Sequence, residues 1–168
     1  DTVVDFLKSL PAGNVILVDN RYCSYTLYKT LQKNQQLIEG KNPTELLKAI
    51  KNPVEQARMQ EIFLKDSVAV TKFIYWLKTH VGKEKITEVT AADYLEQKRR
   101  EIPEFLDLSF PTIAGYKSNA AMMHYEATPE NCATLEPEGM LLVDSGGQYL
   151  GGPTDVTRTI ALGPVSDE

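Results

Sequence analysis

Two aspartates near the C-terminal end of the sequence have a spacing that suits a pair of metal ligands. Asp144 directly follows the apolar run at residues 140–143, and Asp155 follows a connection that contains four glycines. Glycines supply the unusual backbone dihedral angles that a tight or bulged chain reversal needs. The two aspartates are eleven positions apart, and an odd separation allows two residues to lie opposite each other on one face of a hairpin. We therefore predict that the two carboxylates face each other across a sheet.

Two facing carboxylates on a buried sheet repel each other and are costly to remove from water. A divalent cation between them removes this penalty, and carboxylate oxygens suit Mn²⁺, Mg²⁺ or Ca²⁺. Two ions fit better still, because one carboxylate can chelate a single ion while the other spans both. Thr157 lies two residues beyond Asp155, on the same strand face, where its hydroxyl can hold a carboxylate in place, whereas Arg158 should point to the other face. An aspartate at a strand end is also a common turn former, so spacing alone leaves a structural role open.

The segment before these aspartates predicts two helices. Asn52-Pro53-Val54-Glu55 provides an N-cap, a proline at the first helical position and a glutamate that completes a capping box. Apolar residues then recur at helical spacing from Met59 to Val81 and predict a core face, while His80 is read as a histidine that interacts with the helix dipole. A second helix is predicted to start at Thr90 and to close with Lys98-Arg99-Arg100 as a solvated end.

Beyond Pro103 the pattern predicts strands at residues 108–113, 120–125, 140–144 and 155–162. Helices followed by antiparallel strands indicate an α+β domain that begins near residue 45. Residues 1–41 differ, because helical stretches at residues 4–10 and 22–33 alternate with short apolar strands at residues 15–18 and 37–38. This segment is too short to close a sheet alone and is interpreted as the last third of an α/β domain.

Composition excludes several classes of partner. The 168 residues are 42% hydrophobic and 24% charged, as in ordinary globular proteins. The formal net charge is −5 and no Lys/Arg run stands out, which argues against a nucleic-acid partner, and no apolar stretch reaches the length of a membrane span. Cys23 and Cys132 are too few and too far apart for a disulfide scaffold or a cysteine zinc site, so reduced thiols in a cytoplasmic protein are predicted.

Residues 143–149 and 154–159, which surround the two aspartates, resemble a signature of the Xaa-Pro aminopeptidases (aminopeptidase P) within the pita-bread, creatinase-like metallopeptidase family. Residues 107–113 resemble the family's strand that leads to the active site, and residues 119–125 resemble the segment that carries a substrate-contacting histidine. The opening of the long helix is also similar. The resemblance covers residues 45–168 and, with lower specificity, residues 1–41.

The resemblance implies a fold and a set of roles. Residues 42–168 would form the N-terminal half of a pita-bread catalytic domain, and residues 1–41 the C-terminal part of a creatinase-like N-terminal domain. Asp144 would chelate one metal ion, Asp155 would bridge two, and His124 would stabilise charge on the scissile carbonyl oxygen, although without the resemblance His124 would be read as a core histidine. The family's remaining ligands, one histidine and two glutamates, are expected beyond Glu168, and none of the glutamates between residues 126 and 138 matches a ligand position.

The implied activity is that of a dinuclear-metal exopeptidase, with Mn²⁺ as the expected ion, which releases the N-terminal residue from peptides with proline in the second position. The resemblance also allows a homodimer of the full enzyme. By itself this chain is expected to bind metal weakly and not to turn over, because two carboxylates cannot fix a dinuclear site.

Two alternatives remain at this point. One is a prolidase, which carries out the same chemistry on dipeptides. The other is a pita-bread module that binds peptides or proteins without catalysis, although such modules usually lose the two aspartates that are present here.

Overall fold

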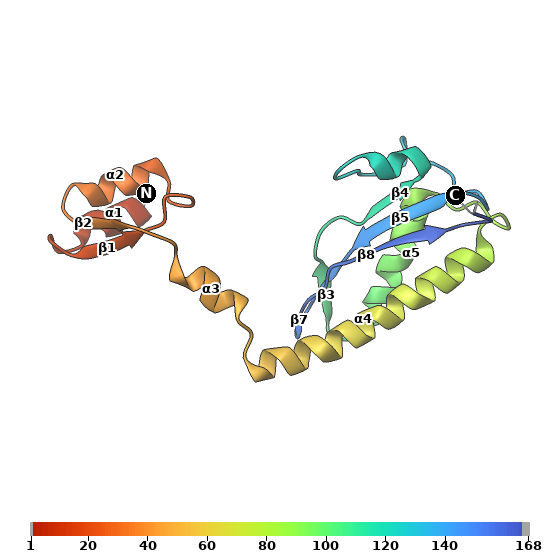
Figure 1. Cartoon of the computed structure of the whole chain (residues 1–168), viewed down its shortest axis with the longest axis horizontal. Coiled ribbons are helices and arrows are strands. Elements are labelled where there is room, and N and C mark those ends of the chain that lie inside the picture. The colour runs from red at the N-terminus through yellow and green to blue at the C-terminus, as the bar shows by residue number, and fades with distance from the viewer. Residues whose placement is uncertain (1, 166–168) are drawn as a thin grey trace. The chain divides into compact units, whose positions relative to one another are not determined.

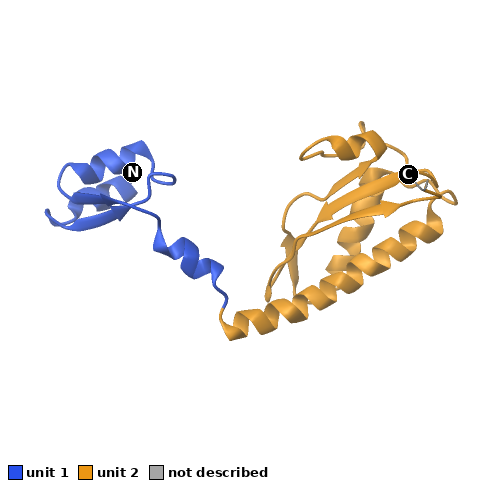
Figure 2. Ribbon diagram, in the orientation of Figure 1, with its two compact units in different colours: residues 1–51 blue, residues 52–168 orange. Residues whose placement is uncertain are grey.

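The computed structural model describes residues 2–165 and divides into two compact units, Asp1–Lys51 and Asn52–Glu168 (Figure 2). Each unit has its own helices and strands (Figure 1).

The first unit contains two parallel strands and three helices. Strand β1 (Val15–Val18) pairs in parallel with β2 (Gln36–Glu39), and helices α1 (Thr2–Ser9) and α2 (Tyr25–Gln32) alternate with them. A third helix, α3 (Pro43–Ala49), follows β2. The alternation of helix and parallel strand predicted for this segment is confirmed.

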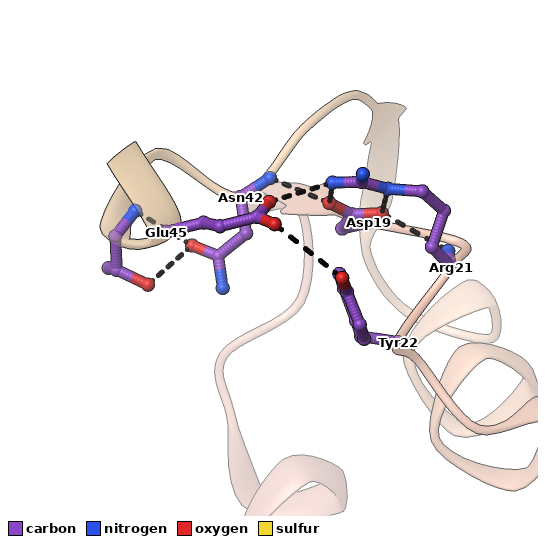
Figure 3. A network of polar contacts seen from close by, with 6 residues as sticks. Asp19, Arg21, Tyr22, Asn42 and Glu45 are labelled. Carbon is purple, nitrogen blue, oxygen red and sulfur yellow. Dashed lines mark hydrogen bonds and ion pairs between the residues drawn. The ribbon is translucent and has the colours of Figure 1, made fainter. Parts of the chain in front are cut away.

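A polar network joins α3 to the end of β1 (Figure 3). The Asp19 carboxylate accepts a hydrogen bond of 2.8 Å from Arg21 Nη2 and another of 2.8 Å from the backbone N–H of Asn42. These hydrogen bonds, with that of Arg21 the stronger cause, hold the pKa of the Asp19 carboxyl well below its usual range. Arg21 Nη2 also lies 2.9 Å from Glu45 Oε2. The network accounts for the place of α3 in the first unit, whose last residue is Lys51, whereas the sequence prediction ended the N-terminal domain at residue 41.

The second unit begins with the long helix α4 (Pro53–His80), and its predicted capping box is confirmed. Asn52 Oδ1 accepts hydrogen bonds of 2.9 Å from the N–H groups of Val54 and Glu55, and Glu55 Oε2 accepts one of 2.8 Å from Asn52 N.

Within the part of the chain that the structure describes, no helix has both the length and the apolar character needed to cross a membrane.

Helix α5 (Glu88–Arg100) begins earlier than predicted. Its N-cap is Thr87, which forms a capping box with Thr90, so the predicted start at Thr90 is wrong. Contacts distant in sequence account for the difference, because Thr87 bridges to Thr134 and the N–H of Glu88 donates to the carbonyl of Ala133 at 3.1 Å.

Beyond α5, the second unit forms two small antiparallel sheets and a short 3₁₀ helix. One sheet has the order β4 (Ile113–Tyr116), β5 (Met140–Ser145) and β8 (Val156–Ala161), and the other has the order β3 (Phe105–Leu108), β6 (Gly147–Tyr149) and β7 (Gly152–Pro153). The predicted strand at residues 108–113 is therefore wrong, because β3 ends before and β4 begins after the proline at position 111, which has no N–H to donate to a strand ladder.

The strand predicted at residues 120–125 is also absent from the structure. Residues Lys117–Ala121 form a 3₁₀ helix instead, and Lys117 and His124 adopt φ angles of 52° and 53°. These angles lie in the left-handed region, which a strand cannot accommodate.

The core of the second unit lies where α4 and α5 pack on the β4–β5–β8 sheet. Leu77, Leu95 and Leu141 are fully buried and come from α4, α5 and β5 in turn. The predicted apolar stripe of α4 is confirmed for Phe73 and Leu77, whereas Phe63 is 37% exposed.

A buried ion pair lies between the two helices and the second sheet. Arg99 Nε and Nη2 donate to Asp66 Oδ1 and Oδ2 at 2.7 and 3.3 Å, and the Tyr149 hydroxyl donates to Asp66 Oδ1 at 2.6 Å. Burial and the bond to Asp66 raise the pKa of Tyr149. The prediction that Lys98-Arg99-Arg100 forms a solvated helix end is wrong for Arg99, which is fully buried and donates to Asp66 of α4, the residue that Tyr149 of β6 also contacts.

Candidate metal centre

Asp144 lies on β5, one residue before the strand ends, and its ladder partner on β8 is Thr157. The Thr157 hydroxyl donates a hydrogen bond of 2.8 Å to Asp144 Oδ1. Thr157 therefore contacts the carboxylate from the strand position that the sequence indicated. Its part in a metal site stays a prediction.

Asp155 immediately precedes β8 and does not lie directly opposite Asp144. The predicted direct cross-strand pairing is wrong, because the glycine-rich connection is not a simple turn. It forms β6 and β7, which belong to the second sheet, so the chain re-enters β8 with Thr157 in the place predicted for Asp155.

Two residues of the connection show why it needs glycine at its start. A Cβ atom on Gly146 would lie 2.0 Å from the carbonyl oxygen of Thr154, a distance that only glycine avoids. The next residue, Gly147, receives the Thr154 side chain, whose Oγ1 accepts a hydrogen bond of 3.0 Å from Gly147 N. Thr154 is buried at this contact and directly precedes Asp155, so the close approach sets where that aspartate leaves the connection.

One cavity brings together the three residues for which the sequence predicted chemistry. Its volume is about 430 Å³, and His124, Asp144 and Asp155 all line it. The remaining lining residues are Phe110, Pro111, Ile113, Tyr125 and Glu126. A larger cavity of about 540 Å³ lies in the first unit, but its lining is mainly apolar and holds none of these three residues.

The described residues leave the two carboxylates accessible to solvent. Within residues 2–165, Asp155 is exposed and Asp144 is half-buried. Among residues 2–165, neither carboxylate forms an ion pair with lysine, arginine or histidine. The negative charge that they bring to one cavity is therefore not neutralised by these residues.

The donor set fits part of a site for divalent cations. Carboxylate oxygens are the ligands that Mn²⁺, Mg²⁺ and Ca²⁺ prefer. Over the described residues, no group of three or more histidine, cysteine, aspartate or glutamate side chains is arranged to hold an ion, and the role of Asp144 and Asp155 as metal ligands stays a prediction.

The two histidines have different surroundings. His124 is exposed at the cavity, so the reading that it is a core histidine is wrong. His80 is not among the residues that line the cavity, and its Nδ1 lies 2.9 Å from the carbonyl oxygen of Trp76 at the end of α4. Glu126, to which sequence reasoning assigned no ligand role, lies at the same cavity.

The two units and the site place the chain among proteins in which a creatinase-type N-terminal domain precedes a pita-bread metallopeptidase domain, so the predicted fold class is confirmed. Residues 57–168 match the model of metallopeptidase family M24, and residues 1–55 match the model of the creatinase/prolidase N-terminal domain. The chain belongs to metallopeptidase family M24.

Curated relatives confirm the resemblance to Xaa-Pro aminopeptidases. The chain is 38% identical to Aminopeptidase P1 of Arabidopsis thaliana over 170 residues, covering 89% of this chain and 26% of that protein. It is also 38% identical to Xaa-Pro aminopeptidase 2 of Mus musculus over 162 residues, covering 96% of this chain and 24% of that protein. The chain thus spans about a quarter of the length of these relatives.

Solved structures agree with this placement. X-prolyl aminopeptidase from Caenorhabditis elegans, a cytosolic enzyme with a di-nuclear active site, superposes with a TM-score of 0.84 at 25% identity, covering 99% of this chain and 28% of that one. A structure of Escherichia coli aminopeptidase P superposes with a TM-score of 0.70 at 18% identity, covering 96% of this chain and 38% of that one, and supports the fold alone.

Proposed function

We propose that the full-length protein containing this chain is a two-metal exopeptidase that removes the N-terminal residue from peptides with proline in the second position. The observation that carries the proposal is that His124, Asp144 and Asp155 line one cavity in the unit that matches family M24. The names of the relatives support the choice of aminopeptidase over prolidase. The retention of both carboxylates supports an enzyme over a binding module.

Each residue at the cavity has a part in this proposal. Asp144, oriented by the Thr157 hydroxyl, would chelate one ion, and Asp155 would span two. Bound divalent ions, with Mn²⁺ the expected species, supply Lewis acidity that polarises a carbonyl group and activates water. The remaining ligands would come from outside the described residues.

His124 would act on the substrate itself. Its imidazole lies at the cavity on an exposed loop, where it would donate a hydrogen bond to the carbonyl oxygen as negative charge develops there. Removing one such donor from other enzymes lowers kcat by about 10²–10³. A dedicated enzyme is needed because proline has no N–H and a fixed φ, which most peptidases cannot accommodate.

Hydrolysis by the full-length protein tests the proposal. We expect cleavage of Xaa-Pro peptides of three or more residues, loss of cleavage after treatment with a chelator, and recovery on addition of Mn²⁺. Asp155→Asn should abolish cleavage, whereas Asp93→Asn, an exposed aspartate of α5, should leave it unchanged. Activity that survives both the chelator and Asp155→Asn would refute the proposal, and activity confined to dipeptides would identify a prolidase.

The same preparation addresses the remaining parts of the proposal. We place the full-length enzyme in the cytoplasm, as a homodimer that contacts peptide substrates rather than nucleic acid or membranes. Light scattering of the purified protein should give the mass of two copies, and a monomer mass would refute this part alone.

A further inference from the structure

Glu88, the first residue of α5, is a fully buried carboxylate outside the candidate metal centre. Within residues 2–165 it forms no ion pair with lysine, arginine or histidine. A buried carboxylate without a cation is costly unless hydrogen-bond donors surround it. The donors that surround the Glu88 carboxylate therefore show which segments of the fold it holds in place.

The donors lie at the last residue of β4 and in the segment that follows it and returns to the start of α5. Glu88 Oε1 accepts hydrogen bonds of 2.7 Å from Tyr116 N and 3.0 Å from Asn119 Nδ2. Glu88 Oε2 accepts bonds of 2.7 Å from the Tyr125 hydroxyl, 2.8 Å from Ala133 N and 3.2 Å from Asn119 Nδ2. One carboxylate thus holds the beginning, the middle and the end of the loop at residues 117–133.

His124 lies within this loop, between two of the donors. Its neighbour Tyr125 is buried, whereas Met122 and Met123 are 50% and 89% exposed. The apolar side chains just before His124 therefore do not fix the loop. His124 itself has a φ of 53°, a conformation uncommon for a residue with a side chain, which persists where its surroundings enforce it.

We propose that Glu88 is a positioning residue for His124, because its carboxylate holds the 117–133 loop in the conformation that brings the imidazole to the cavity with Asp144 and Asp155. This inference rests on the proposed function, in which His124 faces the substrate carbonyl. The raised pKa of Tyr125, about 12 because of burial and the bond to Glu88, agrees with a tightly held contact.

Glu88→Gln is a sharp probe, because it preserves the shape of the side chain while it removes the charge and replaces one acceptor oxygen by a donor. An amide has one acceptor oxygen and one NH₂ donor. Since the backbone N–H of Tyr116 faces one carboxylate oxygen and that of Ala133 faces the other, the NH₂ group must oppose a donor in either orientation. Glu84→Gln, at an exposed site four residues earlier, is the matched control.

Hydrogen exchange measured by mass spectrometry tests the structural step. In Glu88→Gln, we expect amides of residues 117–133 to exchange about tenfold faster than in the wild type, with β5 and β8 unchanged. Glu84→Gln should match the wild type. Tyr125→Phe, which removes one donor and keeps the ring, should shift exchange in the same direction and replaces Glu88→Gln if that variant fails to fold. Unchanged exchange of the loop would overturn the proposal.

Kinetics of the full-length protein test the functional step. Glu88→Gln should lower kcat about tenfold at unchanged metal content, and should cause no further loss in a His124→Ala background. A merely structural role would lower kcat equally in both backgrounds or reduce bound metal, and either result would overturn the proposal. If the wild type shows no metal-dependent cleavage, the proposed function fails, and the exchange measurement still decides whether Glu88 holds the loop.

Discussion

Replacing Arg99 by methionine should destabilise the second unit by about 3–5 kcal/mol, the usual cost of removing one partner from a buried ion pair. Arg99 and Asp66 are both fully buried, with Arg99 Nε 2.7 Å from Asp66 Oδ1. Two unit charges 4 Å apart attract by about 4 kcal/mol at an effective dielectric constant of 20. After the substitution, the Tyr149 hydroxyl would be the one donor among residues 2–165 that still contacts the Asp66 carboxylate. The loss therefore reflects a buried charge left without its cation.

The Asp66–Arg99 pair as a whole contributes less to the free energy of unfolding than the loss expected for Arg99→Met. Arg99 Nη1 is buried and has no hydrogen-bond partner among the described residues, so the pair does not recover its full desolvation cost. Replacing both partners, as Asp66→Leu with Arg99→Met, should therefore recover most of the stability lost in the single variant. Recovery of this kind appears as a coupling energy in a double-mutant cycle.

Urea unfolding followed by tryptophan fluorescence provides the assay, because the single tryptophan, Trp76, lies in the second unit. Its ring stacks on that of Tyr94, with the ring centroids 3.9 Å apart. Arg100→Met is the matched control, since the neighbouring Arg100 is exposed, pairs with Glu96 on the helix surface and should cost less than about 1 kcal/mol. Equal losses in Arg99→Met and Arg100→Met, or a coupling energy of zero, would refute the reasoning.

Two further predictions concern the site and its supporting loop. Thr157→Val removes the hydroxyl that donates to Asp144 and should lower the Mn²⁺ affinity or the activity of the full-length protein about 10–100-fold. Thr159→Val, on the same face of the strand, is the control. Equal losses in the two variants would contradict the role of the Thr157 hydroxyl. Since burial and Glu88 raise the pKa of Tyr125 to about 12, whereas an unfolded tyrosine titrates near pH 10, the unfolded state loses its proton first as pH rises. Stability should therefore be fully present below about pH 10 and decline toward pH 12, and urea unfolding in this range should show a shallower decline for Tyr125→Phe.

Local patterns predicted the features that depend on neighbouring residues. The capping box of Asn52 and Glu55 forms as expected because its hydrogen bonds span three residues. The β1 strand and the core face of α4 follow from apolar spacing in the same way. The motif around Asp144 and Asp155 indicated the family for a different reason, since it matches a known signature and needs no knowledge of distant contacts.

Other features depend on segments that are distant in the sequence. Arg99 reads as one member of a basic helix end, and only the approach of Asp66 and Tyr149, 33 positions earlier and 50 later, makes it a buried ion-pair partner. The start of α5 shifted for a related reason, because Thr134 and Ala133 hold the residues around Thr87.

The sequence by itself determined the long helix α4, the family and the identity of the three residues at the cavity. The tertiary structure decided how they meet. Asp155 is offset from Asp144 because the glycine-rich connection joins a second sheet, and His124 leaves the predicted strand for a left-handed conformation in a loop held by Glu88. Both outcomes arise from hydrogen bonds between segments tens of residues apart, which the periodicity of a single segment cannot encode.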